Sequence, residues 1–167
     1  FEIKIYQRAM KIQMDYDGTA SVASADLLLS MGACNLGLGE TNSAMRCYEE
    51  AKRIFEGRLG KKHDKVAQVL HLMGVIHCER SEQNVAMECF KISLKIRQNN
   101  GMLNDYDAAM ADTLCWIGRV YREQGFSEKA KKYFEVARDA REELFGTDSL
   151  EFAEVLHNIA VIYDDAE

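Results

Sequence analysis

The sequence lacks the features of several large classes of protein. It has no block of lysine or arginine, and its net charge of −6 and pI near 5.3 argue against neutralising nucleic-acid phosphates. Asp26 interrupts the most apolar stretch, residues 22–38, so no uncharged run is long enough to span a membrane. We therefore expect neither nucleic-acid binding nor direct insertion into a membrane.

Signatures of catalysis are also lacking. There is no phosphate-binding loop, no nucleophile elbow and no paired-carboxylate pattern, so we expect no cofactor and no enzymatic activity. The five cysteines form no CxxC pair and stand beside apolar residues within helical patterns. Reduced, buried thiols of an intracellular, cytoplasmic protein fit that pattern best.

What the sequence does contain is a repeat of about 42 residues. The segments LLLSMGAC, VLHLMGVI, TLCWIGRV and VLHNIAVI align at spacings of 42, 44 and 42 residues. Three columns keep this register, namely the small residues Gly32, Gly74, Gly118 and Ala160, the alanines Ala44, Ala86 and Ala130, and the aromatic residues Tyr48, Phe90 and Phe134. Small and large residues that alternate in this way are typical of packed helical hairpins.

Glycine within a helix costs roughly 1 kcal/mol relative to alanine, so three glycines at one repeat position require a gain in packing. We expect Gly32 to let the second helix of its hairpin lie directly against the first. Ala44 would then provide the matching small surface, and Tyr48 would fill the space between units.

The periodicity predicts an all-α chain with helices near residues 1–15, 22–38, 42–58, 65–80, 83–99, 107–124, 128–145 and 150–165. The glycines expected to end helices are Gly39, Gly60, Gly101, Gly125 and Gly146. The candidate N-caps are Thr41, Asp64, Ser81, Ser127 and Ser149, and Asp148 with Glu151 has capping-box spacing.

The register also divides the chain into units. Complete repeats are predicted at 22–64, 65–106 and 107–149, with the second helix of a preceding repeat and its connector at 1–21 and the first helix of a following repeat at 150–167. The two extra residues of the 44-residue spacing fall in the loop at 99–107. Because the chain opens at Phe1 rather than Met, we expect it to belong to a longer chain or a larger complex.

Two-helix units with these columns resemble the tetratricopeptide repeat, and the long period resembles the repeats of kinesin light chain. LGKKHDKVAQVLHLMG at 59–74 and FGTDSLEFAEVLHNIA at 145–160 are similar to that family's connector and following helix, although Asp64 stands where the family usually has proline. The resemblance covers essentially the whole chain. It implies a right-handed α-α superhelix, a solenoid of antiparallel hairpins, that binds proteins and catalyses nothing.

Each first helix has two faces, and the resemblance implies that one of them lines a concave groove. The candidate groove residues are Leu29, Ala33, Leu36, Gln68, His71, Val75, Cys78, Asp112, Cys115, Arg119, Arg122 and His157. This set is apolar in the first two units and basic at Arg119 and Arg122, so we expect a partner peptide or protein with a hydrophobic anchor followed by acidic residues. In the alternative interpretation, the two arginines form a solvated face paired with Glu123 or Asp112.

Other chemical interpretations are weaker. His71, Cys115 and His157 share one repeat position, but neighbouring first helices lie about 10 Å apart, and zinc ligands must converge to about 2 Å from one ion. We therefore expect no metal site there, and a thiol nucleophile at Cys78 is not expected on the same grounds. Trp116, the only tryptophan, is interpreted as a core residue with a partial role in binding left open.

Three functions remain compatible with the sequence. The first is an adaptor that binds a partner in the concave face of the array. The second is a structural segment of a large complex, held by convex or end-on contacts. The third is the sensor or autoinhibitory repeat region of a larger signalling ATPase. The sequence favours the adaptor without separating the three.

Overall fold

A computed structural model of the protein describes residues 2–17, 20–100 and 107–164, and the described residues form helices joined by short connectors. The helices are α1 (Glu2–Asp17), α2 (Val22–Gly37), α3 (Thr41–Leu59), α4 (Asp64–Glu79), α5 (Gln83–Asn100), α6 (Ala108–Glu123), α7 (Ser127–Phe145) and α8 (Leu150–Asp164). Every helix end lies within two residues of its predicted position, and the predicted all-α class is confirmed. Gly101 and most of the predicted loop insertion lie outside the described residues.

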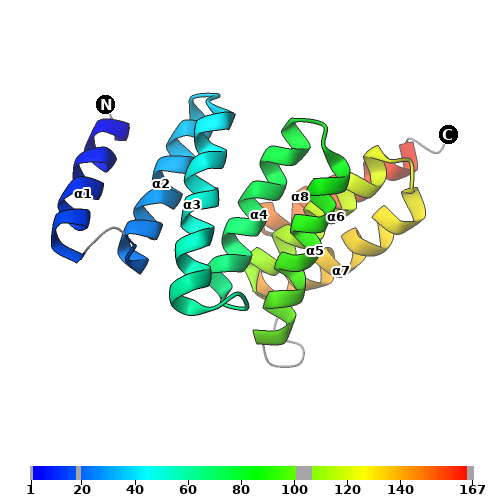
Figure 1. Ribbon diagram of the computed structural model, residues 1–167. Coiled ribbons are helices and arrows are strands. Elements are labelled where there is room, and N and C mark those ends of the chain that lie inside the picture. The colour runs from blue at the N-terminus through cyan, green and yellow to red at the C-terminus, as the bar shows by residue number, and fades with distance from the viewer. Residues whose placement is uncertain (1, 18–19, 101–106, 165–167) are drawn as a thin grey trace.

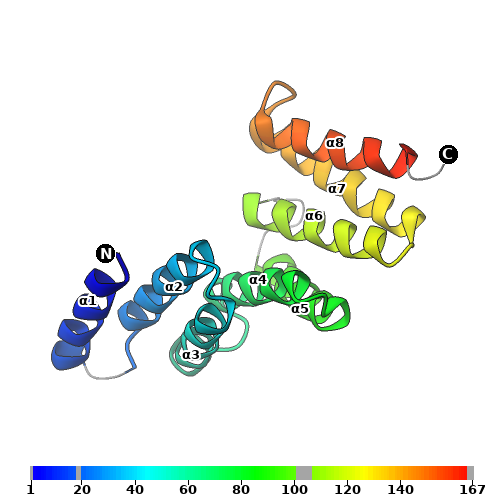
Figure 2. The same ribbon diagram turned by 90° about the horizontal axis from the view of Figure 1, so that it is seen from above.

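Helices α1 to α4 stand side by side in chain order in Figure 1, and Figure 2 shows α6, α7 and α8 following in order, with the two ends of the chain at opposite ends of the array. The closest pairs are α2 with α3, α4 with α5 and α6 with α7, which are the three predicted antiparallel hairpins. Figure 2 shows that the array bends along its length instead of running straight. First helices also contact one another, α4 with α6 and α6 with α8, as expected for an α-α superhelix.

Each repeat glycine lies beneath the aromatic ring of its own hairpin. A Cβ added at Gly74 would come within 2.6 Å of Phe90 Cε1, and one added at Gly118 would come within 2.8 Å of Phe134 Cε1. A Cβ at Gly32 would clash with the ring of Tyr48 in the same way. The predicted close approach is therefore confirmed with a correction, because each ring lies directly against the glycine of its own hairpin.

The aromatic column forms the centre of the core. Tyr48, Phe90 and Phe134 are fully buried, and the buried residues form two clusters, one over α2–α5 and the other over α5–α8. The ring of Phe90 stacks on Trp116 of the next hairpin, with centroids 6.0 Å apart. Burying rings of this size stabilises a helical array by the hydrophobic effect and by ring contacts. One column of residues thus holds each hairpin together, and Phe90 also joins two hairpins.

The predicted helix ends are confirmed more fully than the predicted helix starts. Gly39, Gly60, Gly125 and Gly146 all have positive φ, as expected of residues that end helices. Among the predicted N-caps, only the Ser149 hydroxyl accepts a backbone hydrogen bond, from the N–H of Phe152 at 3.1 Å. That bond makes Ser149 the cap of α8, and the predicted capping box of Asp148 with Glu151 is wrong.

The other predicted caps are wrong by one residue. Thr41, Asp64 and Ser127 are the first helical residues, and the caps are Glu40, His63 and Phe126. At Glu40 and Phe126 no side chain caps the helix. A backbone hydrogen bond closes each turn instead. Glu40 N donates to Asn35 O, and Phe126 N donates to Tyr121 O, both at 2.8 Å. Ser81 lies in the equivalent turn before α5 with a φ of 60°.

Sequence reasoning missed two caps. Ser21 and Ser24 form a capping box at the start of α2, in which each hydroxyl accepts the backbone N–H of the other residue. Asp107 caps α6 through the N–H of Met110. Asp107 also accepts a hydrogen bond from Arg97 at 3.3 Å, which ties the end of α5 to the start of α6.

Tyr48 differs from the other two rings of its column by a hydroxyl group. That hydroxyl is buried and has no hydrogen-bond partner among the described residues, and the equivalent residues are Phe90 and Phe134. A buried hydroxyl without a partner costs about 1–3 kcal/mol. Tyr48→Phe is therefore expected to raise the free energy of unfolding by about 1 kcal/mol, measured by urea denaturation. A loss of stability would show that the hydroxyl has a partner.

Candidate functional site

The predicted groove residues differ in how far a partner could reach them. Leu29 and Cys115 are 8% and 6% exposed and belong to the core. These two side chains lie beneath the surface, where a partner could not contact them. The exposed members are Ala33, Gln68, Asp112 and His157, and the half-buried members are Leu36, His71, Val75, Cys78, Arg119 and Arg122. The accessible part of the predicted set therefore runs along α2, α4, α6 and α8.

Arg119 is held in place by an aromatic ring. Its guanidinium carbon lies 4.3 Å from the centroid of Trp116, and the other stacking contact of that ring is with Phe90, at an interplanar angle of 21°. A cation over an indole face is stabilised by about 0.5–2 kcal/mol. Trp116 is half-buried, so its ring is both a core residue and the support of a surface arginine.

Asp112 is not the partner of Arg119 or Arg122. Its carboxylate accepts a hydrogen bond at 2.7 Å from Arg141, which is 4% exposed and also donates to Glu154 at 2.8 Å. None of the ion pairs found among the described residues includes Arg119 or Arg122. The alternative pairing of these arginines with Glu123 or Asp112 is therefore wrong, because neither acid forms an ion pair with them.

Arg141 is a residue that sequence reasoning missed. It lies on α7 and joins α6 to α8, with a further hydrogen bond of 2.6 Å to the backbone oxygen of Glu151. One signal was available, because Arg141 falls in the repeat column of the buried residue Phe55. A buried arginine requires acidic partners, and the first-helix column supplies them at Asp112 and Glu154.

His71 lies between two first helices. Its Nδ1 is 3.0 Å from the hydroxyl of Thr113 on α6, and its ring is tilted against Phe90 with centroids 5.6 Å apart. Burial lowers the pKa of His71 from 6.5 to about 4; Asp112 opposes this shift and Arg97 adds to it. His71 is therefore neutral at pH 7 and acts as a contact between repeats.

The lowered pKa of His71 predicts a pH-dependent stability. Between pH 6.5 and 4 the unfolded chain binds a proton that the folded chain does not, so stability is complete above pH 6.5 and falls as the pH falls. The free energy of unfolding is expected to drop by about 2 kcal/mol more between pH 7 and pH 5 in the wild type than in His71→Gln. Urea denaturation of both proteins at the two pH values measures this difference. Equal pH dependence would contradict the buried, neutral imidazole.

The thiols and histidines are not arranged for catalysis or metal binding. Burial raises the pKa of Cys78 and of Cys115 to about 11, so both thiols stay protonated at neutral pH and are poor nucleophiles. Within residues 2–17, 20–100 and 107–164, no group of three histidine, cysteine or acidic side chains could hold a metal ion. None of the described helices is long and apolar enough to cross a membrane.

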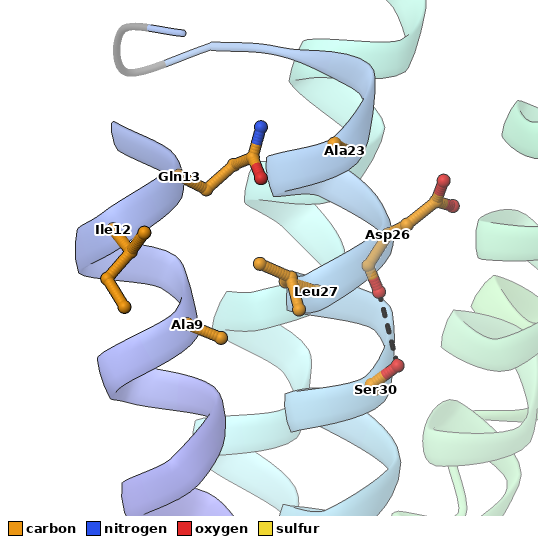
Figure 3. A pocket seen from close by; sticks show the side chains of 7 residues that line it. All are labelled: Ala9, Ile12, Gln13, Ala23, Asp26, Leu27 and Ser30. Carbon is orange, nitrogen blue, oxygen red and sulfur yellow. Dashed lines mark hydrogen bonds between the residues drawn. The ribbon is translucent and has the colours of Figure 1, made fainter. Parts of the chain in front are cut away.

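A cleft of about 530 Å³ lies between α1 and α2 (Figure 3). Figure 3 shows Leu27 pointing from α2 towards Ala9 on α1. The repeat equivalents of Leu27 are Val69, Thr113 and Val155, each fully buried, and Thr113 contacts the preceding first helix through His71. The cleft therefore has the lining of a helix-packing surface, with the Asp26 carboxylate beside it held by Lys65 at 2.6 Å.

The fold and the repeat columns agree with comparisons to known proteins. The sequence profile of the tetratricopeptide repeat family matches residues 24–99 and 104–167. The chain belongs to the tetratricopeptide repeat family. Proteins of this family generally mediate protein–protein interactions and are typically non-catalytic scaffolds. Tetratricopeptide repeat protein 29 of Homo sapiens is 25% identical over 169 residues, which cover 95% of this chain and 33% of that protein.

Solved structures of other proteins show the same arrangement of helices. BtubC (BKLC) from P. vanneervenii is 25% identical with a TM-score of 0.76, over 86% of this chain and 57% of that one. A Podosopora anserina protein, described as a kinesin light chain with nearly identical TPR-like repeats, is 13% identical with a TM-score of 0.76, over 98% and 77%. The predicted resemblance to kinesin light chain repeats is confirmed. The chain spans about a third of the human relative and little more than half of BtubC.

Proposed function

We propose that this chain is a non-catalytic adaptor, located inside the cell, that binds an extended segment of another protein along its first helices. The segment would lie across α4 and α6, with an apolar anchor near Val75 and acidic residues at Arg119 and Arg122. Extended peptides are commonly bound in grooves of this kind, where a few pockets and charges give specificity.

The observation that best supports this proposal is that Arg119 lies over Trp116 and forms no ion pair found among the described residues. The guanidinium is fixed over Trp116, and Asp112, the acid that could have neutralised it, is already paired with Arg141. An arginine held in place loses less side-chain entropy when it binds a carboxylate, so it can contribute more to affinity than a mobile one. Trp116 and Val75, both half-buried, offer apolar surface beside it.

Peptide selection followed by a charge reversal tests the proposal. Peptides selected on the wild-type chain from a random phage-displayed library are expected to combine an apolar residue with two or more acids. The double variant Arg119→Glu with Arg122→Glu is expected to bind the best of them at least ten-fold more weakly, by fluorescence anisotropy. Tenfold corresponds to about 1.4 kcal/mol, a typical cost for losing a charged contact.

A matched control separates a local effect from the change in net charge. Lys61→Glu with Lys62→Glu makes the same change in charge on the exposed connector between α3 and α4. This control is expected to bind within two-fold of the wild type at physiological salt. The proposal fails if both double variants lose affinity equally, or if Arg119→Glu with Arg122→Glu binds as the wild type does.

A further inference from the structure

The turn between α6 and α7 carries a cluster of aromatic and basic side chains, here called the α6–α7 corner. It consists of Tyr121, Phe126, Lys129 and Tyr133, with Lys91 of α5 beside them. Tyr121 stacks on Tyr133 with centroids 5.5 Å apart and meets the edge of Phe126 at 6.3 Å. The ring of Phe126 is 49% exposed, so the cluster reaches the surface.

Two lysines lie against these rings. The Nζ atom of Lys129 is 4.7 Å from the centroid of Phe126 and 5.5 Å from that of Tyr121, and the Nζ atom of Lys91 is 5.8 Å from Tyr121. Neither lysine belongs to any ion pair found in the described parts of the chain. The corner thus holds two fixed positive charges without a carboxylate partner, on a chain whose net charge is −6.

At the equivalent turn of the second repeat, a hydrogen bond between two side chains replaces the aromatic cluster. There His77 stands in place of Tyr121 and Glu82 in place of Phe126, and His77 Nδ1 lies 2.5 Å from the Glu82 carboxylate. The first repeat also has a glutamate, Glu40, at the position of Phe126. Of the three complete repeats, only the third has aromatic residues at both positions, and it has Lys129 where the others have Ser43 and Val85.

A cleft lined by both apolar and polar residues adjoins the corner. A hollow of about 460 Å³ lies between α5 and α6, and its lining includes Met87, Ile92, Tyr121 and Lys91. Ile92 is 43% exposed although it is a large apolar residue. Glu88 is the one carboxylate in this lining, and it forms no ion pair with Lys91. Apolar surface beside unpaired cations is typical of a site for a partner with acidic and apolar residues.

We propose that the α6–α7 corner is a second protein-docking surface, which binds an acidic segment of a partner protein. Carboxylates of the segment contact Lys91 and Lys129, at the one complete repeat that has Phe126 where Glu40 and Glu82 stand in the other two. An apolar side chain of the segment packs in the adjoining cleft against Ile92 and Met87. This surface is separate from the first-helix groove, because Tyr121 lies about 200° around α6 from Arg119.

Restoring the missing acid tests this proposal. The probe is a fluorescein-labelled eight-residue peptide of alternating glutamate and leucine, and the matched probe has glutamine in place of glutamate. Phe126→Glu is expected to weaken binding of the acidic peptide at least ten-fold, because an internal carboxylate then neutralises Lys129. Lys129→Ser, which copies Ser43 of the first repeat, is expected to weaken it several-fold, and Lys61→Ser is expected to bind as the wild type does.

The outcomes separate this surface from the proposed adaptor groove. Equal binding of the glutamine peptide, no binding at millimolar acidic peptide, or unchanged affinity of Phe126→Glu would each overturn the docking surface. If Arg119→Glu with Arg122→Glu abolishes binding and Phe126→Glu does not, the peptide occupies the first-helix groove. That result overturns the docking surface at the corner and supports the proposed adaptor. Both corner substitutions occur naturally in the other repeats, so the fold is expected to tolerate them.

Discussion

Phe90→Ala is expected to lower the free energy of unfolding by about 3–5 kcal/mol. The ring is fully buried, lies over Gly74 within its own hairpin and stacks on Trp116 of the next one, so its loss leaves a cavity between two repeats. Because Trp116 is the only tryptophan, its fluorescence is expected to shift to longer wavelength in the native state of this variant. Urea denaturation and the emission spectrum measure both effects.

Ile92→Ala is the matched control for Phe90→Ala. Ile92 lies on the same helix as Phe90, and the substitution also removes a large apolar side chain. Because Ile92 is 43% exposed, its loss leaves no buried cavity. Its cost is expected to stay below about 1 kcal/mol. If Phe90→Ala costs no more than Ile92→Ala, the aromatic column does not hold the repeats together.

Gly74→Ala is expected to lower the free energy of unfolding by about 2 kcal/mol, although alanine is the better helix former by about 1 kcal/mol. The new Cβ would lie 2.6 Å from Phe90 Cε1, and the fully buried ring has little room to move because it also packs against Trp116. Thermal and urea denaturation measure the change. The prediction is a loss of stability where intrinsic propensity alone predicts a gain.

Gly57→Ala is the control with the opposite expected sign. Gly57 lies inside α3, and a Cβ added there meets nothing within 4 Å. Alanine is therefore expected to stabilise the chain by about 1 kcal/mol. The two variants should differ by about 3 kcal/mol, and a Gly74→Ala protein as stable as Gly57→Ala would disprove the steric role of the repeat glycines.

The helices and the core columns could be predicted from the sequence because both depend on periodic patterns. Gly74 and Phe90 recur at fixed spacings, and a glycine that recurs at one helical position in three repeats indicates a close contact. The error over Tyr48 arose because spacing shows that a ring and a glycine belong together but does not show which neighbour the ring faces. That direction depends on side-chain rotamers and helix crossing angles.

The charged part of the site could not be predicted in the same way. Arg141 joins Asp112 to Glu154 across 29 and 13 residues of sequence, and no local pattern indicates which acids a long side chain will reach. Arg119 lies half-buried on α6, and its support by Trp116 follows from a stack that crosses two hairpins. The N-caps could not be predicted for a related reason, since backbone turns at Gly39 and Gly125 determine where the next helices begin.

The position of a bound partner is the most direct test of the proposed adaptor. Amide chemical shifts of the isotope-labelled chain are to be recorded with and without the peptide selected on the wild type. The predicted result is that the largest shifts fall on α4 and α6, around Cys78, Trp116 and Arg119. Shifts confined to α3, α5 and α7 would contradict binding along the first helices.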